Sequence, residues 1–210
     1  TINGQICIGS NSKQIGTTNT TTSTTTRHPI ASIHDLDELV KSGERALDNK
    51  DYSSAVVAFS HCIELATQQH NIAYLKDFQI YGKRAEAHLE LQNYNLAIDD
   101  SIAARELNPK WAHAYYLEGR AKLLIGEHIN SLPVFAYGLA QEPTNNELFD
   151  ALVDATLKSC YRQDFEPKLQ KLRSLNLDRK PFVVVSMIGQ EILAKGEHTK
   201  HAAVILESAL

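Results

Sequence analysis

The sequence contains nine histidines and three cysteines, the side chains that most often bind a metal or act as a nucleophile. His198 and His201 are three residues apart and would share one face of a helix, but no acidic or cysteine residue nearby completes a zinc site. His61 and Cys62 are adjacent, so on a helix their side chains would point about 100° apart, which does not suit a base and its nucleophile. We therefore expect no metal, no cofactor and no catalytic residue.

Two other patterns could bind phosphate groups. Gly4, Gly9 and Gly16 follow no strand and open no helix, so they do not indicate a phosphate loop. The members of the densest basic cluster are Lys168, Lys171, Arg173, Arg179 and Lys180. This cluster could contact an acidic partner or RNA, but no aromatic residues are interleaved with it. A solvated helix face is the favoured interpretation, and we expect no nucleic-acid partner.

Composition narrows the class of protein. The 210 residues are 43% hydrophobic, with 21 Lys and Arg against 25 Asp and Glu, so no global charge attracts nucleic acid or anionic lipid. The three cysteines are far apart and odd in number, which fits a reducing compartment. No apolar run approaches the ~20 residues of a membrane span, and the first residues lack a secretory signal. We expect a cytoplasmic protein, and its ends suggest a piece of a longer chain.

The first 33 residues differ from the rest. A threonine-rich run occupies 17–26, and such β-branched polar residues bury little and lose entropy in a helix. We interpret 1–33 as a flexible Thr-rich leader. Asn19 begins a glycosylation acceptor triplet, but a threonine run produces that match by chance.

From Asp35 onward, apolar residues recur at the three- and four-residue spacing of helices. The predicted helices are 35–49, 52–68, 72–92, 94–107, 111–125 and 128–141. The connections between them are short, which indicates antiparallel neighbours.

A shift of the sequence by 34 residues aligns it with itself. The aligned pairs are Tyr81 and Tyr115, Ala85 and Gly119, Tyr94 and His128, Ala97 and Ser131, Ala104 and Gly138, and Pro109 and Pro143. A 34-residue period of helix, turn and helix resembles the tetratricopeptide repeat family. Within 34–145 we expect three repeats, at 36–69, 78–111 and 112–145, with eight extra residues near 69–76. The predicted fold is an all-α, right-handed superhelix, an α-solenoid of such repeats.

Small residues predict where the helices touch. At corresponding places the first and second helices of the three repeats carry Gly43 and Ala55, Ala85 and Ala97, and Gly119 and Ser131. Two helix axes approach to about 8 Å only where side chains are small, so we expect each pair to meet. Trp111 and Tyr115 are expected at the joint between repeats, as packing residues. Pro133 falls inside a predicted helix, which it should kink or start late.

The remaining residues, 146–210, continue as further helical pairs. The last pair, from Pro181, resembles a fourth, irregular repeat that is truncated at the end of the chain. Its run of three valines is strand-prone, but the pattern that follows has the helical period, so we predict a helix there.

The first helices of such repeats line a concave face, where an extended or helical peptide is usually held. The residues expected to contact a partner are Asp37, Lys41, Glu44, Lys83, Glu86, Glu90, His113, Tyr116, Leu117 and Arg120. Their character changes from mixed and acidic in the first repeat to apolar and aromatic in the third. We expect a protein partner that presents a peptide or helix with basic and apolar side chains.

Three-repeat modules of Hsp70 and Hsp90 co-chaperones resemble this chain in repeat number. They grip acidic C-terminal tails with a clamp of two Lys, two Asn and an Arg. The corresponding positions here hold Val40, Glu44, Lys83, His113 and Leu117. None has its clamp residue, and a glutamate would repel a carboxylate. We therefore expect no binding of acidic chaperone tails, and the co-chaperone hypothesis is disfavoured.

Four longer phrases extend the resemblance across 36–210, namely LNPKWAHAYYLEGRA, YGLAQEP, KPFVVVSMIGQEIL and AAVILESAL. They resemble the N-terminal region of a very large member of the tetratricopeptide repeat family. That resemblance implies a non-catalytic cytoplasmic scaffold linked to cell division, with a place at the cytoskeleton, spindle midzone or midbody. It also implies a downstream CHAT-type domain, so a regulatory domain of such a protein is the second alternative.

Overall fold

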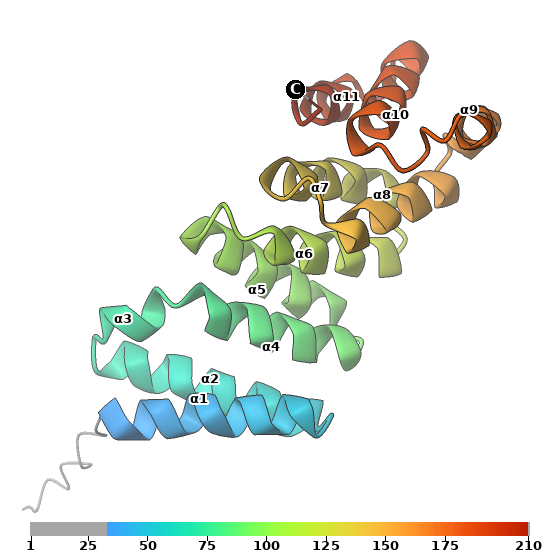
Figure 1. Cartoon of the computed structure of the whole chain (residues 1–210). Helices are drawn as coiled ribbons and strands as arrows, with labels where there is room; N and C mark the ends of the chain where they lie inside the picture. Colours follow the sequence, from blue (N-terminus) through green and yellow to red (C-terminus); the bar gives the residue numbers. More distant parts are fainter. Residues whose placement is uncertain (1–32, 210) are drawn as a thin grey trace, which may run out of the picture. The chain divides into compact units, whose positions relative to one another are not determined.

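The computed structural model describes residues 33–209, which form eleven α-helices and no strand within that range (Figure 1). The helices are α1 (Ile33–Asp48), α2 (Tyr52–Gln68), α3 (Ile72–Leu75), α4 (Phe78–Glu90), α5 (Tyr94–Leu107), α6 (Ala112–Leu124), α7 (His128–Gln141), α8 (Asn146–Lys158), α9 (Arg162–Ser174), α10 (Pro181–Lys195) and α11 (Thr199–Glu207). The predicted leader, 1–33, lies outside the described residues except for Ile33, with which α1 begins.

The helices pair and stack in chain order. α1 packs on α2, α4 on α5 and α6 on α7, while α2, α5 and α7 each also contact the first helix of the next pair. The first helices also touch one another, α1 with α4, α4 with α6 and α6 with α8. This arrangement confirms the predicted all-α solenoid of helix-turn-helix repeats (Figure 1).

The turns within the pairs repeat the same backbone geometry. Lys50, Gln92 and Gly126 occupy equivalent places between the two helices of each pair, and all three have positive φ, at 59°, 61° and 87°. Left-handed backbone is strained for side chains other than glycine, so only the third turn has the residue type that suits it. The repetition therefore includes turn conformation as well as helix length.

The single helix predicted at 72–92 is wrong, because the chain breaks there into α3 and α4. Asp77 adopts an extended backbone (ψ 96°), and its carboxylate accepts the backbone N–H of Gln79 at 3.0 Å. An aspartate that satisfies a first-turn N–H stabilises a helix start at that residue. The extra residues near 69–76 thus form a short helix that precedes the second repeat.

Glycines in the first helices accommodate aromatic rings from the second helices. A side chain at Gly43 would lie 2.6 Å from the ring of Phe59, and Gly119 faces Phe135 in the same way. The atoms nearest to these two glycines belong to the rings, and the expected meeting of the glycines with Ala55 and Ser131 stays a prediction. In the α1–α2 and α6–α7 pairs the two helices therefore approach closely around one buried phenylalanine.

Trp111 lies at the joint between the second and third repeats, as predicted. It is the N-cap residue of α6, and its ring packs on Gly82 and against Phe78, with ring centroids 5.0 Å apart. Tyr115 is 7% exposed and donates its hydroxyl to the Pro109 carbonyl oxygen at 2.9 Å. Both aromatic residues therefore hold consecutive repeats together.

Pro133 lies inside α7, which begins five residues earlier at His128. The late start proposed for this helix is therefore wrong. Proline has no N–H to donate to the carbonyl of Ile129, so the helix continues without that one hydrogen bond.

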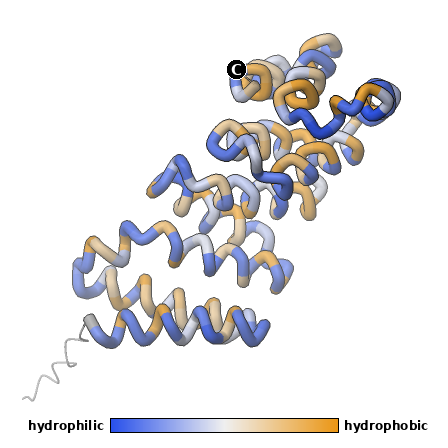
Figure 2. The backbone as a smooth tube through the Cα atoms, viewed as in Figure 1, coloured by the Kyte–Doolittle hydropathy of each residue, from blue (hydrophilic) through white to orange (hydrophobic). Residues whose placement is uncertain are grey.

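The C-terminal helices depart from the repeat pattern. α8 packs on α7 as α6 packs on α5, but the main neighbours of α9 are α8 and α10. α11 pairs with α10 and also packs against α7. The predicted helix at the valine run is confirmed as part of α10. The largest apolar cluster lies in this part, along α7 to α11, where Figure 2 shows many hydrophobic residues.

Candidate functional site

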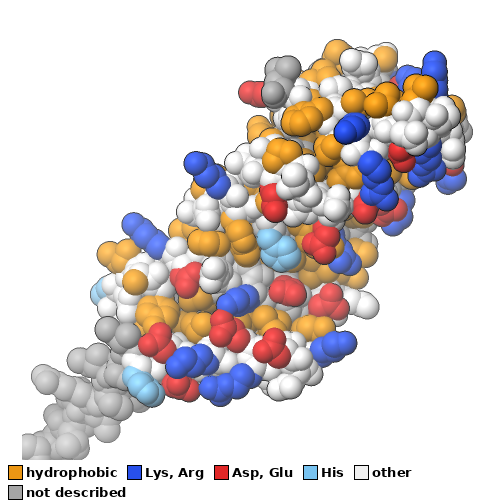
Figure 3. Space-filling model, viewed as in Figure 1, with side chains coloured by type: hydrophobic (Ala, Val, Ile, Leu, Met, Phe, Trp, Pro, Cys, Tyr) orange, Lys and Arg blue, Asp and Glu red, His pale blue; other side chains and the backbone are white. Residues whose placement is uncertain are grey.

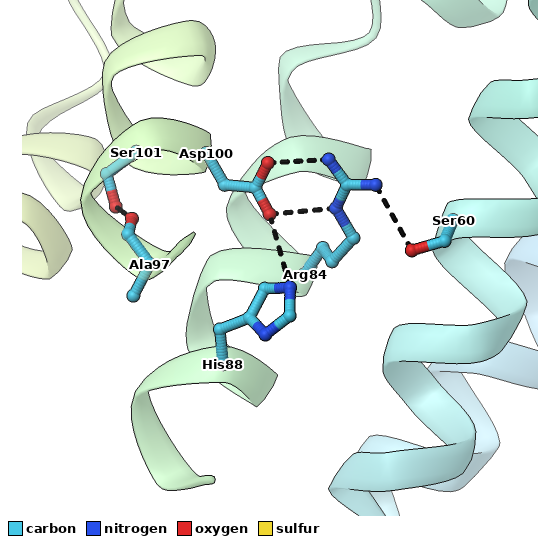
Figure 4. Close-up of polar contacts among 6 residues, drawn as sticks. All are labelled: Ser60, Arg84, His88, Ala97, Asp100 and Ser101. Carbon is cyan, nitrogen blue, oxygen red and sulfur yellow. Dashed lines mark hydrogen bonds and ion pairs between the residues drawn. The ribbon is translucent and has the colours of Figure 1, made fainter. Parts of the chain in front are cut away.

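A buried polar network holds α4 against its neighbours (Figure 4). Asp100 of α5 accepts two hydrogen bonds from Arg84, at 2.8 Å from Nε and 2.6 Å from Nη2. Arg84 also donates to the hydroxyl of Ser60 of α2 at 3.2 Å. A bidentate arginine–carboxylate pair fixes both distance and orientation. The network therefore sets the position of α4, whose opposite face is exposed.

His88 completes this network from one turn further along α4. Its Nε2 lies 3.9 Å from the carboxylate of Asp100, and its Nδ1 is buried without a hydrogen-bond partner (Figure 4). Burial lowers the pKa of His88, Asp100 opposes that shift and Arg84 reinforces it. The ring is thus held neutral in the interior, and it has the role of a packing residue.

The exposed side of the first helices α1, α4, α6 and α8 forms one continuous surface, here called the first-helix face. Across it, Lys83 of α4 forms an ion pair with Glu44 of α1. The hydroxyl of Tyr74, in α3, donates to the carboxylate of Asp37, and this bond together with burial raises the pKa of Tyr74 to about 12. The structure thus brings these predicted residues of the first two repeats together.

An open hollow of about 380 Å³ lies between α1 and α3 at one end of the first-helix face. Its lining consists of Asp37, Val40, Lys41, Glu44, Ala73, Tyr74 and Asp77. Lys41 is paired with Glu38 of its own helix at 3.2 Å. At this end Glu44 is thus paired with Lys83, and the one cation that lines the hollow, Lys41, is held by Glu38.

Glu86 and Glu90 are the predicted contacts in the middle of the face. Both are exposed, and neither forms an ion pair with another of the residues 33–209. They are one helical turn apart on α4, on the same stripe as Lys83. Because Lys83 is occupied by Glu44, the middle of the face presents mainly negative charge.

The predicted residues of α6 form an aromatic and cationic cluster. The rings of His113 and Tyr116 stack with centroids 5.7 Å apart. The guanidinium of Arg120 lies 5.6 Å from the centroid of the Tyr116 ring and donates to its hydroxyl at 3.1 Å. Such contacts hold the tyrosine in one orientation.

Leu117 does not belong to this surface, which corrects its prediction as a contact residue. It is 3% exposed and packs with Ala85, Leu89 and Ala121 in the core between α4 and α6. Its helical position turns it toward α4 rather than toward solvent, so a partner cannot reach it.

Three carboxylates of α8 were missed by the sequence analysis. Glu147, Asp150 and Asp154 line an open hollow of about 420 Å³ opposite Tyr116 and Arg120. Their spacing of three and four residues places them on one helix face. This spacing is visible in the sequence, but the predicted groove ended at α6, the first helix of the third repeat. The lining of this hollow therefore carries three carboxylates and two cations, Arg120 and Lys158.

The carboxylates of α8 are only partly neutralised. Asp150 pairs with Arg179 at 2.5 Å, and Asp154 with Lys158 at 2.7 Å, both at exposed positions. Glu147 has no ion-pair partner among residues 33–209. Figure 3 shows Asp and Glu side chains among hydrophobic ones on this side of the helical unit. The surface suits a ligand that carries positive charge and apolar groups.

The residues considered for metal binding do not gather into a site. Within residues 33–209, no group of three His, Cys, Asp or Glu side chains is placed to hold a metal ion. His198 Nδ1 lies 2.9 Å from the hydroxyl of Tyr161, and the ring meets that of His201 edge-on. The thiol of Cys62 is buried, which raises its pKa to about 11, so it is a poor nucleophile.

A membrane-spanning helix needs about 20 predominantly apolar residues. None of the helices in residues 33–209 is both long and apolar enough to cross a bilayer.

Comparisons with known proteins agree with this architecture. No family model matches the chain. Human tetratricopeptide repeat protein 28 is 38% identical over 182 residues, which cover 87% of this chain and 7% of the relative, so the chain spans only a small part of that relative's length. The second TPR domain of the human RPAP3 protein, in complex with the HSP70 peptide SGPTIEEVD, has 20% identity and a TM-score of 0.52, and covers 59% of this chain and 96% of that one.

A MamA double mutant has 18% identity and a TM-score of 0.56, with 85% of this chain and 94% of that chain covered. These likenesses to solved structures show the fold. The match to the human relative covers 182 of the 210 residues, so it extends beyond the three repeats of 36–145. With its repeated helical pairs, glycine–phenylalanine contacts and turn geometry, the chain belongs to the tetratricopeptide repeat family.

Proposed function

We propose that this chain is a protein-interaction module, without catalytic chemistry, that binds a peptide or helix of a partner on the first-helix face. The partner segment presents basic and apolar side chains. The observation that carries the proposal is the hollow between α6 and α8, where Tyr116 lies among three carboxylates. An apolar side chain can cover the tyrosine ring there while a neighbouring lysine or arginine meets the carboxylates.

The charge of the whole face supports a basic ligand. Lys83 and Lys41, two of its cations, are each held by a glutamate of the chain itself. Glu86 and Glu147 keep their charge without such a partner among residues 33–209. A basic segment therefore gains attraction along the face, which speeds association and sets specificity more than it adds affinity.

The contacts of the clamp positions argue against the co-chaperone alternative. Lys83 is the only permanent cation among them, and Glu44 already occupies it. Leu117 is buried, and His113 stacks on Tyr116 instead of standing free. An acidic tail would meet no free cation at these five places, and it would be repelled by the carboxylates around them.

Charge reversal on the first-helix face tests the proposal. In the double variant Glu86→Lys and Glu147→Lys, both changed residues are exposed, so the fold should be unaffected. We expect the partners captured by the unaltered chain to be lost. The matched control, Glu106→Lys with Glu207→Lys, makes the same charge change on α5 and α11 and should retain them. If the face variant retained every partner that the control retains, the proposal would be wrong.

The cellular role rests on resemblance to the large relative. We propose that the chain serves as part of a cytoplasmic scaffold linked to cell division, at the cytoskeleton, spindle midzone or midbody. A regulatory role toward a downstream CHAT-type domain is the alternative, and it would require that domain in the full-length protein. Proximity labelling in dividing cells, with the face variant as control, would test the location. Labelling that never enriches division proteins would contradict it.

A further inference from the structure

A second cavity lies on the opposite side of α6 from the first-helix face. It is open, has a volume of about 450 Å³, and is bounded by α5, α6, α7 and α11. On α6 its lining residues are Tyr115, Glu118 and Lys122, which lie about half a helical turn around from Tyr116 and Arg120. We call it the rear cavity. It exists because α11 packs against α7, so it depends on the irregular C-terminal helices.

The rear cavity carries an excess of positive charge. Its lining includes three permanent cations, Arg105, Lys122 and Lys200, and a single carboxylate, that of Glu118. Glu118 is 2% exposed and holds Lys122 at 2.7 Å and Arg105 at 2.9 Å. Lys200 has no carboxylate within ion-pair distance among residues 33–209. The cavity thus keeps two positive charges in a chain whose net charge is −4.

Arg105 retains hydrogen-bonding capacity toward the cavity. Its Nε is buried and makes no hydrogen bond, because the contact with Glu118 does not have suitable geometry. The guanidinium lies 5.8 Å from the centroid of the Tyr115 ring, which orients it. The Arg105 side chain is 36% exposed, so N–H groups of its guanidinium other than Nε–H can donate to an oxyanion in the cavity.

The rest of the lining is apolar or aromatic. Tyr115 and Tyr137 stand with ring centroids 6.4 Å apart, and Pro133, Val134 and Val204 contribute aliphatic surface. Tyr137 is 43% exposed although it is a large side chain. A free inorganic ion would leave this surface uncovered. A ligand that combines an anionic head with an apolar body would use both parts of the cavity.

We propose that the rear cavity binds a phosphate monoester whose ester group is aromatic or apolar. A phosphate monoester carries close to two negative charges at neutral pH, which matches the excess of two positive charges in the cavity lining. The guanidinium of Arg105 and the ammonium groups of Lys122 and Lys200 contact the phosphate, and the ester group lies against Tyr137. This proposal does not depend on the ligand of the first-helix face.

His201 provides a reporter inside the cavity. Burial, His198 and Lys122 all lower its pKa. The charged groups that face the cavity from other helices are Arg105, Glu118 and Lys122. Lys200 faces it from α11, the helix that also carries His201. A bound phosphate dianion favours the imidazolium, so the pKa of His201 rises on binding. Proton NMR of the histidine C–H signals measures this rise directly.

Calorimetric titration of the 210-residue chain with phenyl phosphate, inorganic phosphate and phenol tests the proposal. We expect phenyl phosphate to bind more tightly than either part, with a rise in the pKa of His201. Phenyl phosphate that binds no better than inorganic phosphate would indicate an adventitious ion only and would overturn the proposal. A phosphotyrosine in a neutral peptide distinguishes the source. If this peptide binds as tightly as phenyl phosphate, the ligand is a phosphorylated side chain of a protein. If the cavity excludes the peptide, the ligand is a small free ester.

The variant Lys200→Glu assigns the effect to this cavity. Lys200 is exposed, so the change should leave thermal unfolding unaltered, and we expect phenyl phosphate affinity to fall about tenfold. The control Lys110→Glu makes the same charge change at an exposed position between α5 and α6, outside the cavity, and should bind like the unaltered chain. Equal affinity of all three proteins would contradict the proposal.

Discussion

Two opposite faces of α6 differ in charge although each presents a tyrosine. On the first-helix face, Tyr116 lies opposite the carboxylates of α8. On the rear side, Tyr115 lies beneath the guanidinium of Arg105 and beside Lys122. The first surface is produced by repetition, because equivalent helices are placed side by side. The second is produced by a departure from repetition, because α11 packs on α7. The two proposed ligands, of opposite charge, would therefore share one helix.

The largest expected effect is a loss of overall stability, which would weaken both faces of α6 together. Phe135 is fully buried against Gly119 of α6, so Phe135→Ala should lower the free energy of unfolding by about 4 kcal/mol. Urea unfolding followed by circular dichroism measures the loss. Phe182 is 52% exposed, and Phe182→Ala is the matched control, with an expected loss of under about 1 kcal/mol. Equal losses at the two sites would contradict the role assigned to Phe135.

A smaller effect is expected at the support of the first-helix face. Asp100→Ala leaves the guanidinium of Arg84, which is largely buried, without its bidentate partner. We expect a loss of about 2 kcal/mol, less than for a fully buried pair because Arg84 keeps some contact with solvent. Asp99→Ala, at the exposed neighbouring position, should change the stability little. A harmless Asp100→Ala variant would show that the network does not hold α4.

Acid should weaken both regions through two histidines, His88, which is buried, and His201, which is half-buried. Burial lowers the pKa of His88 in the network and of His201 in the rear cavity. Between the folded pKa values and the unfolded value of 6.5, the unfolded chain binds more protons than the folded one. The contribution to the free energy of unfolding that is present above pH 6.5 is therefore lost as the pH falls through the folded pKa values. The slope is at most about 1.4 kcal/mol per pH unit for each group. Urea unfolding between pH 7.5 and 5.5 measures it, and His88→Gln should reduce the slope.

The smallest expected effect tests the repetition that generates the first-helix face. Gln92 has φ of 61° where the equivalent turn has Gly126 at 87°. Gln92→Gly should therefore raise the free energy of unfolding by about 0.5 to 1 kcal/mol, and Gly126→Ala should lower it by about 1 kcal/mol. Thermal unfolding of the two variants measures both signs. A loss of stability in Gln92→Gly would show that the turns are not equivalent.

What repeats in the sequence was predictable, and what depends on a single contact was not. The 34-residue spacing predicted the helical pairs, and it placed Trp111 at a joint between repeats, where the structure shows its ring packed on Gly82. The break at Asp77 follows from one side-chain cap, which a continuous apolar pattern conceals. Leu117 lies on α6 between the partly exposed His113 and Arg120, and its contacts with α4, which the sequence does not show, bury it.

The rest of the two sites depends on contacts between residues distant in the sequence. Arg84 and Asp100 belong to different helices, and nothing in their spacing indicates that they meet. The carboxylates of α8 belong to the first-helix face because α8 packs beside α6 and continues the row of first helices. Lys200 reaches the rear cavity because α11 packs on α7, a contact that no repeat pattern predicts.

The most direct test of the central claim is amide NMR of the chain during titration with two peptides. One is a helical peptide of lysine and leucine, and the other is the acidic HSP70 peptide SGPTIEEVD. We predict that the basic peptide shifts amides along α1, α4, α6 and α8, including those of Glu86, Tyr116 and Glu147, and that the acidic peptide shifts none of them. Binding of the acidic peptide to this face with equal or higher affinity would contradict the account.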